Sequence, residues 1–485
     1  MSRYSVGVLA RSEGGELASP AAITRGGPIA PAMLASCVMA TEALLLLGAG
    51  GVAAVSSPGL PLAEAYLASL VATALAVALL NRRGGHALAY FRAARPRSYR
   101  SLLAVGAAGL SAGGLLVSLV PPELRATAGG FSAIWSLVSA LLISCFRAYV
   151  AFCLTRGRTS ERLTCNVAVV GDGERARSAA AWVGADPAGM VRVSGVFSDA
   201  STDGLAHPDL DELVARGRRD RLDAVVLALP PASPDRMERV VRALSGMAVD
   251  VYLAVDLSMP RVAGTRATWL GGAPVLVLDE RPLKDWQGLQ KAVFDRTFAV
   301  FLLVLVSPLL ALAALAIRLD TPGPIFFRQP RIGFNGVPFY IYKFRTMHHH
   351  MSDMLASQQT SRGDPRVTRV GRWLRKLSVD ELPQLLNVLR GEMSLVGPRP
   401  HTPGTRAGQK ALDDIVAEYA RRHRVRPGIT GWAQVNGCRG PIRTERDIRR
   451  RVGHDLYYIE NWSLAFDLRI IVLTLTSKAI ISEAF

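Results

Sequence analysis

The sequence predicts a membrane protein in three parts: an N-terminal four-helix transmembrane bundle, a central Rossmann-like α/β domain and a C-terminal, mostly helical monotopic domain with a Ser-Pro re-entrant membrane helix. Three observations predict this fold class. Four apolar stretches fill the first third of the chain, and alternating buried strands and helices follow. A further long apolar run near residue 300 carries a proline at its centre. Hydrophobic residues make up 50% of the 485, which is high for a soluble protein.

The net charge of +18 predicts anionic partners such as membrane lipids, nucleotides or lipid phosphates. The sequence contains no signature of an RNA- or DNA-binding module, so nucleic acid is not an expected partner. Five cysteines are scattered and form no CxxC pair. The sequence therefore predicts neither a disulfide framework nor a zinc site.

The transmembrane bundle is predicted over residues 29–155, after a polar cytoplasmic tail formed by residues 1–28. Each apolar stretch approaches the ~20 residues that a membrane-spanning helix needs. The four stretches are 29–55, 62–80, 101–120 and 131–154. Arginines concentrate in the second connector and after the fourth stretch, whereas the first and third connectors contain only Arg125. The positive-inside rule therefore places both ends of the bundle in the cytoplasm.

The Rossmann-like domain is predicted over residues 163–280, where four buried β-runs alternate with helical segments. Gly171, Gly173 and Ala176 fit the pattern G-x-G-x-x-A, and Asp199 ends the next strand, as a ribose-binding acid does. These residues are a candidate nucleotide turn. The interpretation favoured by the sequence alone is a structural turn that binds nothing, because such turns recur in doubly wound sheets without a ligand.

The apolar run 298–317 contains Ser307 and Pro308 at its centre. Proline removes a helical hydrogen bond, and serine can satisfy the carbonyl that is freed. The run could form a kinked spanning helix or a helix that enters one leaflet and turns back. Basic residues flank both sides, so the positive-inside rule favours a re-entrant helix over about residues 292–318. A second apolar stretch, 468–481, is short for a span and suits the membrane interface.

The segment "SVDELPQ" (378–384) sets two adjacent carboxylates, Asp380 and Glu381, among many arginines. Ser378 and Glu381 match a capping box. That reading would make Pro383 the fifth helical residue, where it removes a hydrogen bond. Pro383 fits better at the first helical position. The two acids then lie just outside the helix and are free to point into a site.

Several cations of the C-terminal block suit phosphate oxygens, because arginine forks match phosphate and lysine supplies a point charge. They are Lys343, Arg345, Arg366, Arg369, Arg372, Arg375 and Arg399. Each of these residues, taken alone, is more simply explained as a surface charge. Together, around Asp380 and Glu381 and beside a membrane segment, they predict a site for an anionic lipid or a nucleotide. We expect the positive field to lower the pKa of a carboxylate there, which can then bind Mg²⁺ or attack phosphorus.

The C-terminal block, residues 286–485, resembles the bacterial polyprenol-phosphate sugar-phosphate transferases, the monotopic phosphoglycosyl transferase superfamily. The resemblance rests on "YKFRTM", "DPRVTRVGRWLRKLSVDELPQLLNVLRGEMSLVGPRP", "RHRVRPGITGWAQVNG" and "DLYYIENWSL". The spans and the α/β domain resemble the long form that initiates exopolysaccharide, capsule or O-antigen synthesis. "GPRPH" and the closing "DLYYIENWSLAFDLRIIVLTL" look most like the branch that uses UDP-glucose, with UDP-galactose as its neighbour.

The resemblance implies a two-step reaction on the cytoplasmic face of the bacterial inner membrane. Asp380 attacks the β-phosphate of a UDP-sugar and releases UMP, and the phospho-sugar then passes to undecaprenyl phosphate. Asp380 and Glu381 help to bind Mg²⁺. The resemblance also gives phosphate-binding roles to Lys343, Arg375 and Arg399, a polar site position to Asp455, and the bend of the re-entrant helix to Ser307 and Pro308.

Two departures from the family pattern concern local contacts and leave the acid pair intact. Lys291 is followed by Ala292, where the family often has arginine, and "NGCRGPI" lacks an acidic residue that often follows its "RG". Two other function classes fit the sequence less well. An NAD-dependent nucleotide-sugar dehydratase or epimerase needs a Tyr-x-x-x-Lys pair, which is absent between residues 165 and 280. A non-enzymatic scaffold would not need the acid pair. A homo-oligomer is a further expectation, because a noncatalytic soluble domain needs some role.

Overall fold

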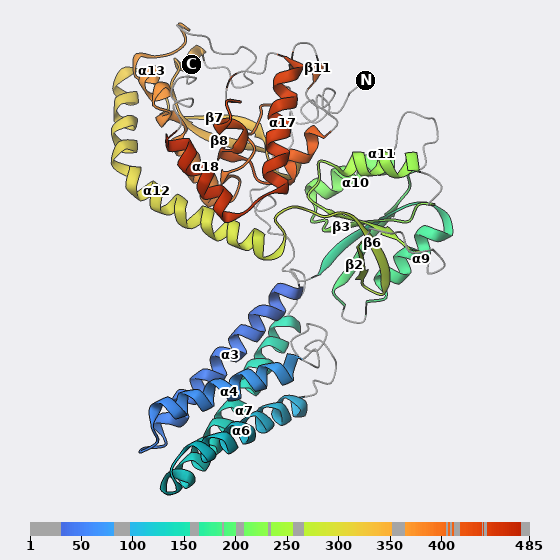
Figure 1. Cartoon of the computed structure of the whole chain (residues 1–485). Helices are drawn as coiled ribbons and strands as arrows, with labels where there is room; N and C mark the ends of the chain where they lie inside the picture. The colour runs from blue at the N-terminus through green and yellow to red at the C-terminus, as the bar shows by residue number, and fades with distance from the viewer. Residues whose placement is uncertain are drawn as a thin grey trace.

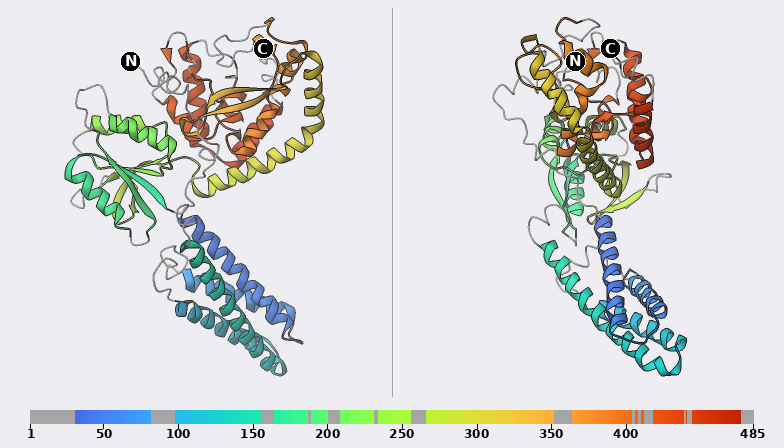
Figure 2. Two further views of the ribbon diagram at one scale, coloured as in Figure 1. Left: turned by 180° about the vertical axis from the view of Figure 1, so that it is seen from behind. Right: turned by 90° about the vertical axis from the view of Figure 1, so that its left-hand side faces the viewer.

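The computed structural model describes residues 31–81, 98–155, 164–186, 189–199, 208–230, 234–255, 266–351, 364–403, 406–407, 410–411, 418–438, 440 and 444–476. The predicted tail and the arginine-rich segments 82–97 and 156–162, on which the predicted orientation of the bundle depends, lie outside these residues. Figure 1 shows three parts, with a helical bundle projecting away from an α/β domain and a C-terminal domain that lie side by side. The bundle stands apart from the other two parts when seen from behind and from the side (Figure 2).

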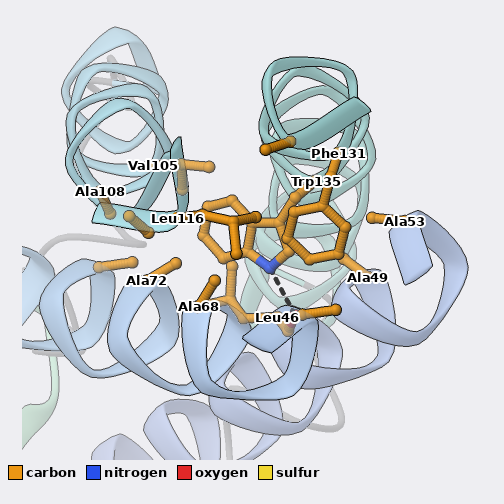
Figure 3. Close-up of a cluster of buried hydrophobic side chains, with 14 of the residues drawn as sticks. Leu46, Ala49, Ala53, Ala68, Ala72, Val105, Ala108, Leu116, Phe131 and Trp135 are labelled. Carbon is orange, nitrogen blue, oxygen red and sulfur yellow. Dashed lines mark hydrogen bonds between the residues drawn. The ribbon is translucent and has the colours of Figure 1, made fainter. Parts of the chain in front are cut away.

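The bundle consists of α3 (Pro31–Val55), α4 (Leu62–Asn81), α6 (Ser98–Leu119) and α7 (Arg125–Thr155), the last of which follows a short 3-10 turn, η1 (Pro122–Leu124). All four helices are long and apolar enough to cross a membrane. Small residues such as Ala49, Ala68 and Ala108 fill their common core around Trp135, which lets the helices approach closely (Figure 3). The indole nitrogen of Trp135 donates to the carbonyl of Leu46 at 3.2 Å.

A buried ion pair links three of these helices. Arg147 on α7 donates to both carboxylate oxygens of Glu42 on α3, at 2.6 and 3.1 Å, and to the Ser101 hydroxyl on α6 at 3.3 Å. Glu42 is wholly buried. A charge inside an apolar bundle is tolerated when it is paired, so this contact fixes how the helices face one another.

The described residues of the α/β domain form six strands and three helices. In chain order they are β1 (Cys165–Val170), α9 (Gly173–Gly184), β2 (Val191–Phe197), α10 (Pro208–Arg219), β3 (Ala224–Leu227), α11 (Pro234–Leu244), β4 (Asp250–Ala254), β5 (Ala267–Leu270) and β6 (Ala273–Asp279). The sheet order is β2-β1-β3-β4-β6-β5, in which the first four strands are parallel and β6 is antiparallel to both of its neighbours, β4 and β5. Helix α9 covers one face, and α10 and α11 cover the other (Figure 1). The antiparallel edge is a feature that the sequence did not indicate.

Helix α12 (Asp285–Asp320) carries Pro308 in its interior and bends in the middle (Figures 1 and 2). Pro308 has no N–H to donate to the carbonyl of Val304. The hydroxyl of Ser307 donates to that same carbonyl at 2.8 Å. Both limbs pack on the C-terminal domain, with Ala299 buried before the bend and Ile317 buried after it. Between Val300 and Leu315 nearly all of the exposed residues of α12 are apolar, and they include Phe301, Val304, Leu305 and Leu312.

The rest of the C-terminal domain surrounds a two-stranded hairpin of β7 (Phe326–Ile332) and β8 (Pro338–Phe344). It continues with α13 (Arg369–Lys376), η4 (Val379–Gln384), α14 (Leu385–Arg390), β9 (Ser394–Val396), η5 (Tyr419–Arg424), β12 (Gly428–Thr430), α16 (Trp432–Val435), α17 (Glu445–Glu460) and α18 (Leu464–Thr476). The prediction of a mostly helical domain therefore lacked the hairpin, which lies against η4. Helix α18 exposes Leu468, Val472 and Leu475, as an interfacial helix does, and its interfacial position stays a prediction.

The α/β and C-terminal domains are joined by polar contacts. Asn335, between β7 and β8, accepts from the amide of Ala248 at 2.9 Å and donates to the carbonyl of Gly217 at 3.0 Å. Arg424 pairs with Asp279 at 2.7 Å. These contacts hold the two domains side by side.

Candidate active site

The two adjacent acids lie on η4, a 3-10 helix that precedes α14. Ser378 makes no side-chain capping hydrogen bond and has a left-handed backbone (φ 56°), so the capping box that the sequence pattern also allowed is absent. The placement of Pro383 at the first position of an α-helix is also wrong, because Pro383 lies within η4 and α14 begins at Leu385. A 3-10 helix has about three residues per turn, so neighbouring side chains point roughly 120° apart. The two carboxylates therefore face different surroundings.

Glu381 is held by two cations from different segments. Lys343 on β8 pairs with its Oε1 at 2.8 Å, and Arg399, after β9, donates to Oε1 at 2.7 Å and to Oε2 at 3.3 Å. Arg399 and Lys343 hold the pKa of Glu381 well below its usual range, although burial opposes them. Glu381 is therefore a permanent anion that orders Lys343 and Arg399.

Asp380 forms no hydrogen bond or ion pair with any residue that the structure describes. Burial raises its pKa to about 6, the negative charge of Glu381 adds to this, and Lys343, Arg375 and Arg399 oppose it. The expectation that the positive field lowers the carboxylate pKa is thus right for Glu381 and wrong for Asp380. Burial outweighs the nearby cations at Asp380, which has no cation in direct contact. At neutral pH, Asp380 is therefore a largely ionised carboxylate with no described hydrogen-bond or ion-pair partner.

The other predicted cations differ in what they contact. Arg375 on α13 donates to the Thr346 hydroxyl at 2.9 Å and lies close enough to Asp380 to affect its pKa. Arg366 grips Asp364 with two nitrogens, at 2.7 to 3.1 Å. Arg369 is exposed at the first position of α13.

Arg345 has a structural contact that the sequence did not suggest. It is 3% exposed, and its guanidinium donates to the carbonyls of Thr321 and Pro322 and to the Thr321 hydroxyl, at 2.6 to 3.0 Å. These groups close the C-terminal end of α12. The sequence predicts that Arg345 binds phosphate, whereas in the structure these donors face inward and are used by the end of α12. Lys343 lies on β8 and pairs with Glu381, whereas Arg345 follows the end of β8 at Phe344, where the regular strand pattern no longer fixes its side chain.

Asp455 lies inside a buried network behind Arg399. It pairs with Arg422 at 2.7 Å, and both side chains are 2% exposed. Arg422 also donates to the backbone carbonyl of Arg399 at 2.9 Å and contacts the ring nitrogen Nδ1 of His401 at 2.7 Å. Burial and the adjacent arginines hold the pKa of His401 well below its usual range, so the ring is neutral. The network supports the backbone that carries Arg399. The sequence analysis missed His401 and Arg422, although both stand inside the motifs "GPRPH" and "RHRVRPG".

The acid pair can be tested for its fit to Mg²⁺. The described residues contain no cluster of three or more candidate metal-binding side chains. Mg²⁺ is commonly held by one or two carboxylates together with waters and substrate phosphates, so Asp380 with a bound diphosphate fits this ion. Glu381 already neutralises two cations and is the weaker candidate ligand.

The candidate nucleotide turn of the α/β domain has the predicted backbone and an unexpected partner. Gly171 and Gly173 both have positive φ; Gly171 directly follows β1, and Gly173 is the first residue of α9. Asp199 follows β2 as predicted, but Arg236 donates to both of its carboxylate oxygens at 2.6 and 2.7 Å. Arg236 also pairs with Asp172, inside the turn, at 2.7 Å. An acid held in this way is not free for a ribose hydroxyl, which favours the structural interpretation of the turn.

Comparison with known proteins assigns the chain to a family. A bacterial sugar transferase family matches residues 286–480, and a CoA-binding domain family matches residues 75–254. The exopolysaccharide production protein PSS of Rhizobium leguminosarum bv. phaseoli is 46% identical over 195 residues, which cover 40% of this chain and 98% of that protein. The chain belongs to the bacterial sugar transferase family.

Longer relatives of this bacterial sugar transferase extend the match into the α/β domain. An undecaprenyl-phosphate glucose phosphotransferase of Komagataeibacter xylinus is 48% identical over 327 residues, covering 67% of this chain and 61% of that protein. A UDP-glucose:undecaprenyl-phosphate glucose-1-phosphate transferase of Escherichia coli (strain K12) is 38% identical over 296 residues, covering 60% and 62%. The matches thus span about three-fifths of these two relatives. Asp380, Glu381 and the cations around them all lie within residues 286–480, the segment that matches the bacterial sugar transferase family.

Proposed function

We propose that this bacterial sugar transferase moves glucose 1-phosphate from UDP-glucose to undecaprenyl phosphate and releases UMP. The observation that carries the proposal is the unequal acid pair. Asp380 is an uncommitted carboxylate, whereas Glu381 beside it is fixed by Lys343 and Arg399. A nucleophile must be free to attack, and the cations around it must be ordered before the substrate arrives. The names of the long relatives support the donor and the acceptor.

The proposed reaction has two displacements at one phosphorus atom. A carboxylate oxygen of Asp380 attacks the β-phosphorus of UDP-glucose, and the bond from that phosphorus to the bridging oxygen breaks. UMP leaves with the electron pair, and glucose 1-phosphate remains bound to Asp380 as an acyl phosphate. An oxygen of undecaprenyl phosphate then attacks the same phosphorus. This step frees the Asp380 carboxylate and forms undecaprenyl-diphosphate-glucose.

The proposed roles of the other residues follow from their positions. Lys343, Arg375 and Arg399 stabilise phosphate oxygens as charge develops in each displacement. Glu381 keeps two of these cations in place, and the Arg422 network holds the backbone of Arg399. Asp380 would hold Mg²⁺, which would supply charge neutralisation to the diphosphate of the donor. The transfer would begin an exopolysaccharide, capsule or O-antigen chain, and a homo-oligomer also stays a proposal.

The proposed site lies on the cytoplasmic face of the bacterial inner membrane, next to a re-entrant α12. Both limbs of α12 pack on one domain, and the exposed residues between Val300 and Leu315 are nearly all apolar. A helix that crossed the bilayer would have to place these two limbs on opposite sides. Single cysteines at Gln290 and Pro324, in a chain whose five native cysteines are replaced, test this topology. We expect an impermeant maleimide to label both from the cytoplasmic side, and labelling of either from the periplasm would contradict the re-entrant helix.

The transfer itself is tested by UMP release. The full chain in nanodiscs is incubated with Mg²⁺, undecaprenyl phosphate and either UDP-glucose or UDP-galactose, and Asp380→Asn is assayed in parallel. We expect UMP from UDP-glucose and none from the variant. UMP from UDP-galactose alone would retain the mechanism and change the donor. An intact protein that releases no UMP from a panel of UDP-sugars would favour a scaffold.

A further inference from the structure

A pocket of about 380 Å³ lies where the three parts of the chain meet. Its walls come from the segment after α10, the linker between β6 and α12, the first limb of α12 and the approach to β12. Met33, near the start of the first bundle helix, also lines it. Asp380 and the cations around it do not. The pocket is therefore separate from the proposed transfer site and adjoins the membrane end of the bundle.

The pocket has more positive than negative charge. Nine of its lining residues are arginine or lysine, and four are aspartate. Two of the aspartates are already engaged inside the protein. Asp295 accepts from Lys291 at 3.0 Å and from the Ser394 hydroxyl at 2.8 Å. Asp223 pairs with Arg221 at 3.2 Å and with Arg281 at 3.8 Å. Carboxylates outside the lining pair with three further cations: Glu280 with Lys284, Asp467 with Lys291 and Asp279 with Arg424. The unbalanced positive charge is therefore that of the exposed Arg219 and Arg296 and the half-buried Arg426.

Arg296 and Arg426 are the clearest case of this imbalance. Neither guanidinium forms a hydrogen bond or an ion pair with another residue in the part of the chain that the structure describes. Burial lowers the pKa of Arg426, and the charge of Arg296 lowers it further, so the two groups lie close enough to repel each other. The Nε atoms of Arg281, Arg424 and Arg426 are all buried and have no hydrogen-bond partner among the described residues. Such donors cost stability unless an acceptor meets them.

We propose that this junction pocket binds a phosphate-bearing anion through Arg296 and Arg426, carried either by an anionic lipid headgroup or by a soluble phosphate compound. Phosphate offers several acceptor oxygens to guanidinium groups in the geometry that arginine prefers. A bound anion would remove the repulsion between the two arginines and link the bundle, the α/β domain and the C-terminal domain. Binding therefore stabilises the assembled chain.

The test measures thermal unfolding of the full chain in nanodiscs and needs no sugar transfer. Nanodiscs of phosphatidylcholine alone are compared with the same discs plus inorganic phosphate, at matched ionic strength, and with discs containing phosphatidylglycerol. The pocket variant is Arg296→Gln with Arg426→Gln. The control variant, Arg239→Gln with Arg446→Gln, removes the same charge from two exposed arginines outside the pocket. It corrects for the general attraction of a basic protein to anionic lipid.

We expect the anion to raise the unfolding temperature of the native chain and of the control. In the pocket variant the apparent affinity falls on the order of tenfold for each arginine removed. A response to phosphatidylglycerol alone identifies a headgroup, and a response to inorganic phosphate identifies a soluble ligand. The proposal is overturned if neither probe stabilises the native chain, or if the pocket variant responds as the control does. A pocket variant that is less stable than the native chain without any anion, or that fails to fold, also overturns it.

Discussion

Arg399 binds Glu381 through two nitrogens and makes no such contact with the neighbouring Asp380. Lys343 likewise pairs with Glu381, at 2.8 Å, and not with Asp380. The 3-10 geometry of η4 separates the two side chains, so that one acid orders the cations and the other stays free. This division of roles leads to predictions that distinguish the two carboxylates.

Asp380→Asn should abolish transfer, because an amide cannot form the acyl phosphate. We expect kcat/KM for UMP release to fall on the order of 10³-fold or more. The loss of one carboxylate with no described partner should leave the thermal unfolding temperature unchanged or raise it. A folded variant that keeps near-native UMP release would eliminate Asp380 as the nucleophile.

The pKa of Asp380 predicts how the reaction depends on pH. Since burial raises that pKa to about 6, the nucleophile is ionised above this pH and protonated below it. We expect kcat/KM to decline about tenfold per pH unit below about 6, because kcat/KM reports groups of the free enzyme. A profile that stays flat down to pH 4.5 would contradict the assignment.

Glu381→Gln gives a matched test of the same profile. The charge of Glu381 raises the pKa of Asp380, so its removal should move the acidic limb of the profile to lower pH. The remaining activity should also fall, since Lys343 and Arg399 lose the anion that orders them. An acidic limb that moves to higher pH would mean that the two carboxylates are not close neighbours in the working enzyme.

The sequence supported the three-part architecture and the acid pair, and it did so through local patterns. Apolar runs of spanning length predicted α3, α4 and α6 closely, and Ser307 next to Pro308 indicated the bent helix. The sequence could not predict which residues the charged side chains pair with. Whether Arg345 meets a phosphate or the end of α12, and whether Asp199 is free or held by Arg236, depends on tertiary contacts between distant segments.

Arg345→Gln and Lys343→Gln should separate a structural cation from a catalytic one two residues away in the sequence. Arg345 supports the end of α12 with buried hydrogen bonds, and hydrogen bonds to charged groups contribute about 1.5–3 kcal/mol. Arg345→Gln should therefore lower the unfolding temperature and leave the KM for UDP-glucose unchanged. Lys343→Gln should reduce kcat/KM on the order of 10²-fold with a smaller effect on stability. If Arg345→Gln instead reduced kcat/KM with little effect on stability, Arg345 would belong to the phosphate site.

Ser307 and Pro308 should show strong coupling in a double-mutant cycle. The Ser307 hydroxyl is the donor to the Val304 carbonyl, which Pro308 cannot reach with an N–H. Ser307→Ala should cost about 0.5–1 kcal/mol in denaturant titrations in micelles, because that carbonyl then has no donor.

The same substitution should be nearly neutral in a Pro308→Ala background. The new backbone N–H of residue 308 then donates to Val304, and the hydroxyl is no longer needed. Ser111→Ala is the matched control, since Ser111 also donates to a helix carbonyl, that of Ala107, at 2.8 Å. That carbonyl lies inside an uninterrupted helix and keeps its backbone donor, so the control should cost little. Equal losses for Ser307→Ala with and without Pro308 would show that the serine does not compensate for the proline.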